Sequence, residues 1–122
     1  MRRYSPAARL YHATRYSLNG LLAAFREEQS FEYEAVVLVV LLAVVLTVGA
    51  PFPEAVALIG CWLAVMAFEL VNGAVERAFD LIDQEHNPHI KAGKDMLSAA
   101  VFLMILFNAV LWGVFFYRGI FY

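Results

Sequence analysis

Three long apolar runs constrain the fold of this chain more than any other feature of its sequence. They cover about residues 34–50, 55–71 and 96–117. A helix that crosses the hydrocarbon core of a bilayer needs roughly 20 mostly apolar residues. Hydrophobic residues occupy 62% of the 122 positions, a share well above that of ordinary soluble domains. The runs therefore predict an all-α membrane protein, with three transmembrane helices in a single domain that covers residues 1–122.

Turn and cap signals place the ends of the predicted helices. Ser5 is a favourable N-cap and Pro6 a favourable first residue, so we expect an N-terminal helix to begin there. The prolines of "PFP" at 51–53 and Pro88 are interpreted as breaks, because proline cannot continue a helix. We expect helices over about residues 6–27, 30–50, 54–83 and 92–118. The helix over 54–83 is expected to extend beyond the membrane at its end.

The N-terminal helix is predicted to be amphipathic. Its apolar side chains can share one side, and three arginines are interspersed among them. The apolar residues are Leu10, Ala13, Leu18, Leu21, Leu22 and Phe25, and the basic ones are Arg9, Arg15 and Arg26. This pattern is typical of a surface helix that lies in the membrane interface. A helix docked in the groove of a soluble partner is the alternative.

Basic residues are distributed unevenly around the predicted spans. Five arginines precede the first span, the turn "GAPFPE" contains no Lys or Arg, and three basic residues separate the second span from the third. Under the positive-inside rule, this predicts a cytoplasmic N-terminus and an external, periplasmic C-terminus in a bacterial inner membrane. Any charged substrate is therefore expected on the cytoplasmic side.

Other classes of protein fit the sequence poorly. A cleavable signal peptide is disfavoured, since the first apolar run begins more than thirty residues into the chain and two more follow. Cys61 is the lone cysteine, so no disulfide framework is expected. No Walker-type loop or GxGxxG pattern is present, and the three histidines lack a zinc-binding spacing. We expect no nucleic-acid partner.

A polar stripe follows the second apolar run. Glu69, Asn72, Glu76, Asp80 and Asp83 are spaced by 3, 4, 4 and 3 residues, which places them on one face of a helix. Such spacing also suits a water-exposed face, and this interpretation stays open for Asp80 and Asp83. An ionisable residue in a membrane span is costly. Glu69 is therefore predicted to be functional and to have polar partners on other helices.

Two other segments are expected at the depth of this stripe. Four glutamates precede the first span, and "KDMLS" at 94–98 begins the third with Lys94, Asp95 and Ser98. Carboxylates gathered from separate helices favour Mg²⁺, which takes few protein ligands besides substrate phosphates. Together with a lysine, they have the composition of a phosphoryl-transfer site. A structural ion-pair cluster and a proton or cation pathway use the same residue types and stay open as alternatives.

Three motifs resemble those of the prokaryotic diacylglycerol kinase family, which comprises small trimeric membrane enzymes with three transmembrane helices per chain. "RYSLNGLLAAFREEQSFEYE" resembles the family's surface helix and first glutamate motif, and "FELVNGAVERAFDLI" resembles its E-x-x-N-x-x-x-E signature. "KDMLSAAV" resembles the third-helix motif, and the resemblance covers about residues 9–112. It implies ATP-dependent conversion of diacylglycerol to phosphatidic acid at the cytoplasmic membrane interface. It also implies a homotrimeric helical bundle whose active sites are shared between subunits.

The resemblance further implies roles for individual residues. Glu69 would be the general base, and Asn72 and Lys94 would complete the catalytic set. Glu28 and Glu76 would hold Mg²⁺. The residues that contact the nucleotide and its metal would be Arg9, Tyr16, Glu28, Glu76, Asp80, Glu85, His86, Asn87, Lys94 and Asp95. Those that contact the lipid would be Arg9, Ser17, Glu69, Ser98 and Trp112.

The chain departs from the family pattern in three places. Asn19 replaces a common lysine, His86 and Asn87 stand where an aromatic residue and a histidine are usual, and Lys91 is displaced from the usual basic position. These departures concern the adenine contacts rather than the core chemistry. Relatives that phosphorylate undecaprenol make that lipid an alternative substrate, although the longer N-terminal segment favours diacylglycerol. A small ion- or proton-conducting membrane protein is the alternative from another functional class.

Overall fold

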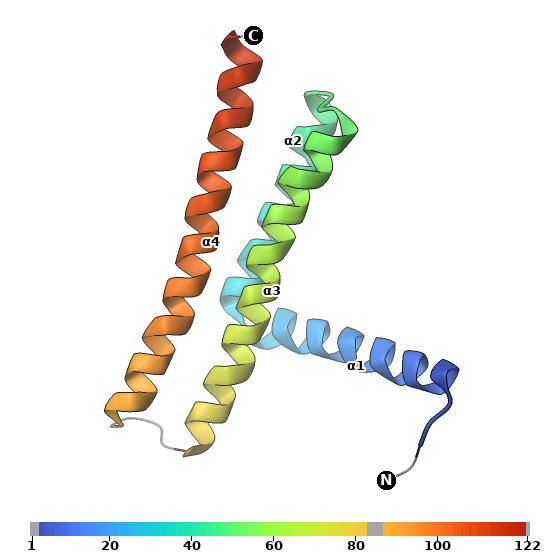
Figure 1. Ribbon diagram of the computed structural model, residues 1–122, viewed down its shortest axis with the longest axis vertical. Coiled ribbons are helices and arrows are strands. Elements are labelled where there is room, and N and C mark those ends of the chain that lie inside the picture. The colour runs from blue at the N-terminus through green and yellow to red at the C-terminus, as the bar shows by residue number, and fades with distance from the viewer. Residues whose placement is uncertain (1–2, 83–86, 122) are drawn as a thin grey trace.

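The structure is a computed structural model that describes residues 3–82 and 87–121, and within these ranges its regular structure is entirely α-helical (Figure 1). The helices are α1 (Pro6–Glu27), α2 (Gln29–Thr47), α3 (Phe52–Ile82) and α4 (Pro88–Phe121). The helices α2, α3 and α4 are long and apolar enough to cross a membrane. The prediction of an all-α membrane protein with three spanning helices is confirmed. Three residues of the predicted site region, Asp83, Glu85 and His86, lie outside the described ranges.

Helix α1 begins where its cap signals predict. The Ser5 hydroxyl accepts a hydrogen bond from the Ala8 backbone N–H at 3.2 Å, and Pro6 occupies the first turn. Figure 1 shows α1 running from the foot of α2 outward, on the side opposite α4, in a direction transverse to the other three helices. Its exposed apolar side chains, such as Leu10 and Leu18, fit a helix that lies along a membrane surface.

The chain changes direction sharply between α1 and α2. Glu28 is the single residue between them, and its backbone is extended, with φ −110° and ψ 106°. No proline or glycine forces this break. Acidic residues are unfavourable at a helix C-terminus and favourable at an N-terminus, so Glu27 and Glu28 weaken the end of α1 while Glu32 favours the start of α2. The carboxylate of Glu28 is therefore placed by the joint between two helices of different direction.

Two connections differ from the predicted ends. Helix α2 stops at Thr47, because Gly49 adopts a positive φ of 66° that ends the helix before the prolines. Helix α4 begins at Pro88, although the sequence interpretation treated that proline as a break and started the helix near residue 92. The Asn87 side chain accepts a hydrogen bond from the His89 N–H at 2.9 Å, which makes Asn87 the cap and Pro88 the first residue of α4.

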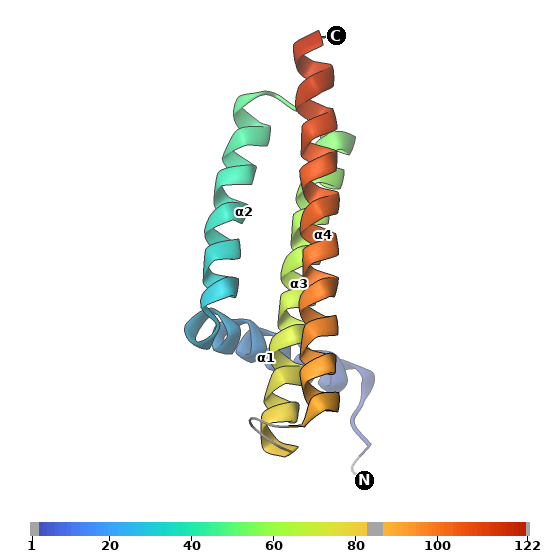
Figure 2. The ribbon, with the colours of Figure 1, turned by 90° about the vertical axis from the view of Figure 1, so that its left-hand side faces the viewer.

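Helix α3 is the centre of the arrangement. It packs against α2 on one side and α4 on another, whereas α2 and α4 do not contact each other in the described part of the chain (Figure 2). A small core of Ala24, Phe31 and Met66 joins α1, α2 and α3. Above it, the Trp62 indole donates to the Glu34 carbonyl at 2.9 Å. This junction holds the N-terminal end of α2 next to the part of α3 that carries the polar stripe.

Candidate active site

The candidate site is built around Glu69 on α3. Its carboxylate is half-buried and receives a side-chain hydrogen bond from Asn72, and the charges of Glu28 and Glu76 act on it as well. Glu28 comes from the α1–α2 joint, so carboxylates from two parts of the fold lie within electrostatic reach of each other. Repulsion among them must be offset by cations or by protonation.

Lys94, from α4, contributes a positive charge next to the acids of α3. The Lys94 ammonium donates a hydrogen bond to the Asp80 carboxylate at 2.8 Å and is also within electrostatic reach of Glu76. This contact joins α3 to α4 beside the stripe. The packing allows it because the Phe79 ring lies directly against the backbone of Gly93, where an added Cβ would be only 2.8 Å from the ring. The two helices therefore approach closely just where Asp80 and Lys94 meet.

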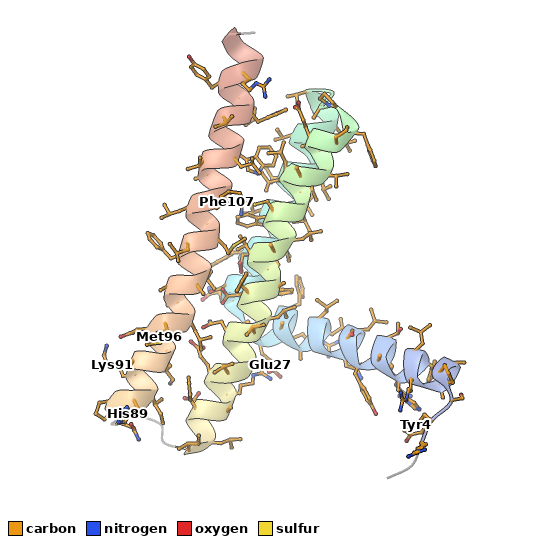
Figure 3. The ribbon with its side chains drawn as sticks, in the orientation of Figure 1. Tyr4, Glu27, His89, Lys91, Met96 and Phe107 are labelled. Atoms are coloured by element: carbon orange, nitrogen blue, oxygen red, sulfur yellow. The ribbon has the colours of Figure 1, made fainter. Side chains whose placement is uncertain are left out.

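Glu28 lies against α3 at two points. One carboxylate oxygen would be 3.2 Å from a Cβ built at Gly73, so the side chain rests on a stretch of backbone that has no side chain. The same oxygen lies 3.5 Å from the Arg77 guanidinium, which also pairs with Glu27. Figure 3 places Glu27 at the junction of α1 with α3, whereas Tyr4 marks the far end of the N-terminal segment.

A cavity of about 640 Å³ lies between α1 and α3 beside these charges. Its lining combines the Glu28 and Glu69 carboxylates and the Arg77 guanidinium with Ser17, Gly20, Leu21, Ala23, Ala24, Phe31, Leu70, Gly73 and Ala74. Its size is within the range of small-molecule sites. An apolar wall facing a few charged groups suits an amphiphile with a polar head. A second cavity, of about 620 Å³, lies near Gly49 and the end of α4 and contains none of the predicted site residues.

The described residues contain no ready-made metal cage, since no three His, Cys, Asp or Glu side chains are grouped closely enough to hold an ion by themselves. Mg²⁺ needs no such cage, because it is commonly bound through one or two carboxylates plus water and substrate phosphates. Glu28 and Glu76 both act electrostatically on Glu69. Glu28, from the α1–α2 joint, and Glu76, from α3, therefore fit a divalent ion that binds together with a phosphate ligand.

Comparison with known proteins shows the family of the chain. The family model for prokaryotic diacylglycerol kinase matches residues 15–116. The chain belongs to the prokaryotic diacylglycerol kinase family. A diacylglycerol kinase of Haemophilus influenzae is 36% identical over 104 residues, which are 85% of this chain and 88% of that protein. The diacylglycerol kinases of Pseudomonas aeruginosa and Escherichia coli K12 are each 38% identical, and each match covers 85% of both chains.

Within this diacylglycerol kinase fold, the single chain assembles only part of the predicted site. The residues that it brings together are Glu28, Glu69, Asn72, Glu76, Asp80 and Lys94. Asp95 instead pairs with Lys91 at 2.8 Å, and Figure 3 shows Lys91 on the side of α4 away from α3. Ser98 is exposed one turn further along α4, and Ser17 lines the α1–α3 cavity. Asn87 caps α4.

Three other predicted residues of this kinase lie far from Glu69. Arg9 and Tyr16 are exposed on α1 and precede Glu28 by 19 and 12 residues, about 28 Å and 18 Å along a helix. Trp112 is 18 residues beyond Lys94 on α4, about 27 Å along a helix. Its indole nitrogen is buried without a hydrogen-bond partner among the described residues. One chain therefore does not place these three side chains at the carboxylates.

The sequence interpretation included Glu34 only as one of four glutamates that could be partners of Glu69, and it assigned no role in the site to Arg77. Glu34 is only 8% exposed, neither carboxylate oxygen has a hydrogen-bond partner within the described ranges, and its charge repels that of Glu69. A glutamate inside a membrane helix is itself a functional signal. For Arg77, no signal in the sequence indicated the pairing with Glu27 and Glu28, because that contact depends on how α1 meets α3.

Proposed function

We propose that the protein transfers the γ-phosphoryl group of ATP to the free hydroxyl of diacylglycerol. The bond between the γ-phosphorus and its bridging oxygen breaks, a bond to the lipid oxygen forms, and the products are ADP and phosphatidic acid. The observation that carries this proposal is a half-buried glutamate, Glu69, that lines an amphiphile-sized cavity and lies within electrostatic reach of Glu28 and Glu76. Glu76 is in turn within electrostatic reach of Lys94. Family membership supports the choice of reaction.

Glu69 is the proposed general base. It accepts the proton of the lipid hydroxyl as the oxygen attacks, and a base for that step must reach the hydroxyl directly or through one water. Asn72 holds the Glu69 carboxylate by a hydrogen bond and so orients the accepting oxygen.

Glu28 and Glu76 are the proposed ligands of Mg²⁺. Their carboxylate chemistry and their separate positions around Glu69 fit an ion that also takes phosphate oxygens as ligands. When bound, the ion supplies positive charge that offsets the negative charge on the phosphates. The fixed carboxylates of the protein would hold the ion and so determine the position in which the phosphates of the nucleotide bind.

Lys94 is the proposed partner of the transferred phosphoryl group. In the structure its ammonium is held by Asp80, which fixes it beside Glu76. An ammonium placed there in advance stabilises negative charge on the phosphoryl oxygens without reorganising during the reaction. Asp80 is thus a positioning residue. Asp95 pairs with Lys91 in the single chain, so its proposed role is only the contact with the nucleotide that the family resemblance implies.

The remaining residues are proposed to bind the ends of the two substrates. Arg9, Tyr16 and the segment 85–87 would contact the nucleotide, and Ser17, Ser98 and Trp112 would contact the lipid, as would Arg9. Arg9 lies 18 residues before Glu27, about 27 Å along α1, so it cannot serve the carboxylates of its own chain. We propose a homotrimer in which α1 of one subunit reaches the site of another.

The protein is proposed to lie in the bacterial inner membrane, with the site at the cytoplasmic interface. The distribution of basic residues supports an orientation with α1 and the α3–α4 connection on the cytoplasmic side and the Gly49 turn outside. ATP is available on that side. The free hydroxyl of diacylglycerol lies at the headgroup level, where the cavity between α1 and α3 opens beside Glu69.

An assay that offers both lipids tests the substrate. Purified protein in mixed micelles receives γ-³²P-ATP, Mg²⁺ and equal amounts of diacylglycerol and undecaprenol. Labelled phosphatidic acid supports the proposal, and label on undecaprenol alone makes that lipid the substrate. If neither lipid is labelled, the proposed reaction is wrong.

A further inference from the structure

The Arg77 guanidinium extends from α3, the helix that carries Glu69, to the α1–α2 joint that carries Glu28. It bonds to Glu27 at the end of α1 and lies 3.5 Å from Glu28 Oε1. Both acids precede α2, while Arg77 is on α3, so the guanidinium ties the α1–α2 joint to the central helix. A guanidinium suits this place, because its planar group of donors can engage two carboxylates together.

The position of Glu28 needs such a tie. Glu28 is the residue at which the backbone breaks, and its side chain forms no capping hydrogen bond to α2. Its carboxylate lies against α3 at Gly73. This contact stops the carboxylate from moving closer to α3 but does not keep it from moving away. The nearby charge of Glu69 repels the Glu28 carboxylate. Of the side chains that contact Glu28, Arg77 is the one that attracts it toward α3.

We propose that Arg77 is a positioning residue that holds the Glu28 carboxylate at Gly73, in the place from which it binds a divalent cation. This inference rests on the proposed role of Glu28 as a metal ligand. Arg77 touches neither the lipid hydroxyl nor the phosphates in this role. It acts through Glu28, and through Glu27 as the second anchor on α1.

The sign of the effect separates this role from simple electrostatics. Removing a positive charge near a cation site raises the local attraction for the cation, so charge alone predicts tighter metal binding in Arg77→Gln. Loss of position predicts weaker binding, because the Glu28 ligand is then free to move away from α3. Partners that orient metal ligands commonly change affinity by an order of magnitude or more. Arg77 is half-exposed, which reduces the expected effect to about fivefold.

Binding of Mn²⁺ to the full chain tests the proposal without turnover. Mn²⁺ is titrated into protein loaded with β,γ-methylene-ATP, and binding is followed by the relaxation enhancement of water protons. We expect Arg77→Gln to bind Mn²⁺ about fivefold more weakly than the parent chain. Glu27→Gln, which removes the same link from the α1 side and leaves α3 unchanged, should weaken binding by about twofold. Arg77→Lys, which keeps the charge but not the planar group of donors, should fall between the parent and Arg77→Gln.

Arg26→Gln is the matched control. It removes one positive charge from the last turn of α1, next to Glu27, and should leave Mn²⁺ affinity unchanged. Unchanged or tighter Mn²⁺ binding in Arg77→Gln overturns the proposal, and so does an equal loss in Arg26→Gln. If Arg77→Gln fails to fold, Arg77→Lys decides the question, because it keeps the charge and loses only the planar group of donors: weaker Mn²⁺ binding supports the proposal, and unchanged binding overturns it.

Activity measured in parallel distinguishes this proposal from the proposed function. With Arg77→Gln, the Mg²⁺ concentration for half-maximal activity should rise about fivefold, while kcat at saturating Mg²⁺ stays within about twofold of the parent value. A general structural defect would lower kcat as well. If the parent chain binds Mn²⁺ as expected but phosphorylates no lipid, the proposed function fails while the role of Arg77 stands.

Discussion

Two lysines that are only three positions apart have different surroundings. Lys94 is half-buried and pairs with Asp80 across the α3–α4 contact, whereas Lys91 is exposed and pairs with Asp95 on its own helix. Both ion pairs have the same length, 2.8 Å. Proximity to the acids on α3, rather than pairing as such, is therefore the reason for proposing Lys94, and not Lys91, for phosphoryl transfer.

Lys94→Gln should lower kcat by about 10²-fold or more, because the phosphoryl oxygens lose a charged donor that is fixed in place. The measurement is steady-state lipid phosphorylation at saturating ATP and Mg²⁺. Lys91→Gln is the matched control and should stay within about twofold of the parent, since its exposed ion pair contributes little. Equal losses in the two variants would contradict the assignment.

Glu76→Gln should raise the Mg²⁺ concentration for half-maximal activity by at least roughly tenfold, because one of the few carboxylate ligands becomes neutral. A Mg²⁺ titration at saturating ATP measures it. Glu54→Gln, at the opposite end of α3, removes the same charge without touching the site and serves as the control. A normal Mg²⁺ dependence in Glu76→Gln would remove this residue as a ligand.

At the scale of helices, the contact between α3 and α4 sets the register of the site. The Phe79 ring occupies the space that a side chain at position 93 would need, one residue from both Asp80 and Lys94. At the apolar middle of the same pair of helices, Asn108 is 3% exposed and donates to the Cys61 carbonyl at 3.1 Å. The two contacts lie far apart along α4, so they fix both the distance and the register of the helices.

Gly93→Val should destabilise the fold by about 1–3 kcal/mol, because the added atoms collide with Phe79 and push the helices apart. Activity should fall with it, since Lys94 then moves away from Asp80. Thermal unfolding in detergent and lipid phosphorylation are the two measurements. Phe79→Val combined with Gly93→Val should recover much of both losses, and a double variant no better than Gly93→Val would contradict the role of this contact.

Asn108→Leu should lower the stability of the folded protein by about 0.6 kcal/mol, and by no more than about 1.7, the range for single interhelical hydrogen bonds in membranes. Unfolding in mixed micelles of increasing denaturing-detergent content measures the change. Val110→Leu, on the exposed side of the same turn, should leave stability unaltered. Greater stability in Asn108→Leu would mean that the hydrogen bond to α3 contributes nothing.

The sequence predicted which residues of α3 share a face, but it did not predict the contacts between helices. The spacing of Glu69, Asn72 and Glu76 alone indicated a shared face, and the cost of an acid in a span indicated function. The partners of those residues depend on interhelical distance and register, which sequence spacing does not contain. Gly93 opposite Phe79 and Gly73 opposite Glu28 are such cases, and so is the backbone break at Glu28, which occurs without proline or glycine. Pro88 was misinterpreted because proline both ends helices and begins them.

At the scale of the whole molecule, the chain leaves much of its apolar surface exposed. Val65 is the largest side chain that is fully buried within the described ranges, whereas Leu46, Phe102 and Val110 are among many apolar side chains that face outward. In a membrane such surface faces acyl chains or neighbouring subunits. Helix α1 projects from the bundle, and it carries Arg9 and Tyr16 at a distance from Glu69. A homotrimer in which neighbouring subunits complete each site would explain both observations.

The central claim is that Glu69 removes the proton of a lipid hydroxyl during phosphoryl transfer. Single-turnover transfer from γ-³²P-ATP to diacylglycerol, measured for the parent chain and for Glu69→Gln in the same micelles, tests it most directly. The claim predicts labelled phosphatidic acid from the parent and a rate about 10²- to 10⁴-fold lower in Glu69→Gln, with nucleotide binding retained. Transfer at the parent rate by Glu69→Gln would contradict it.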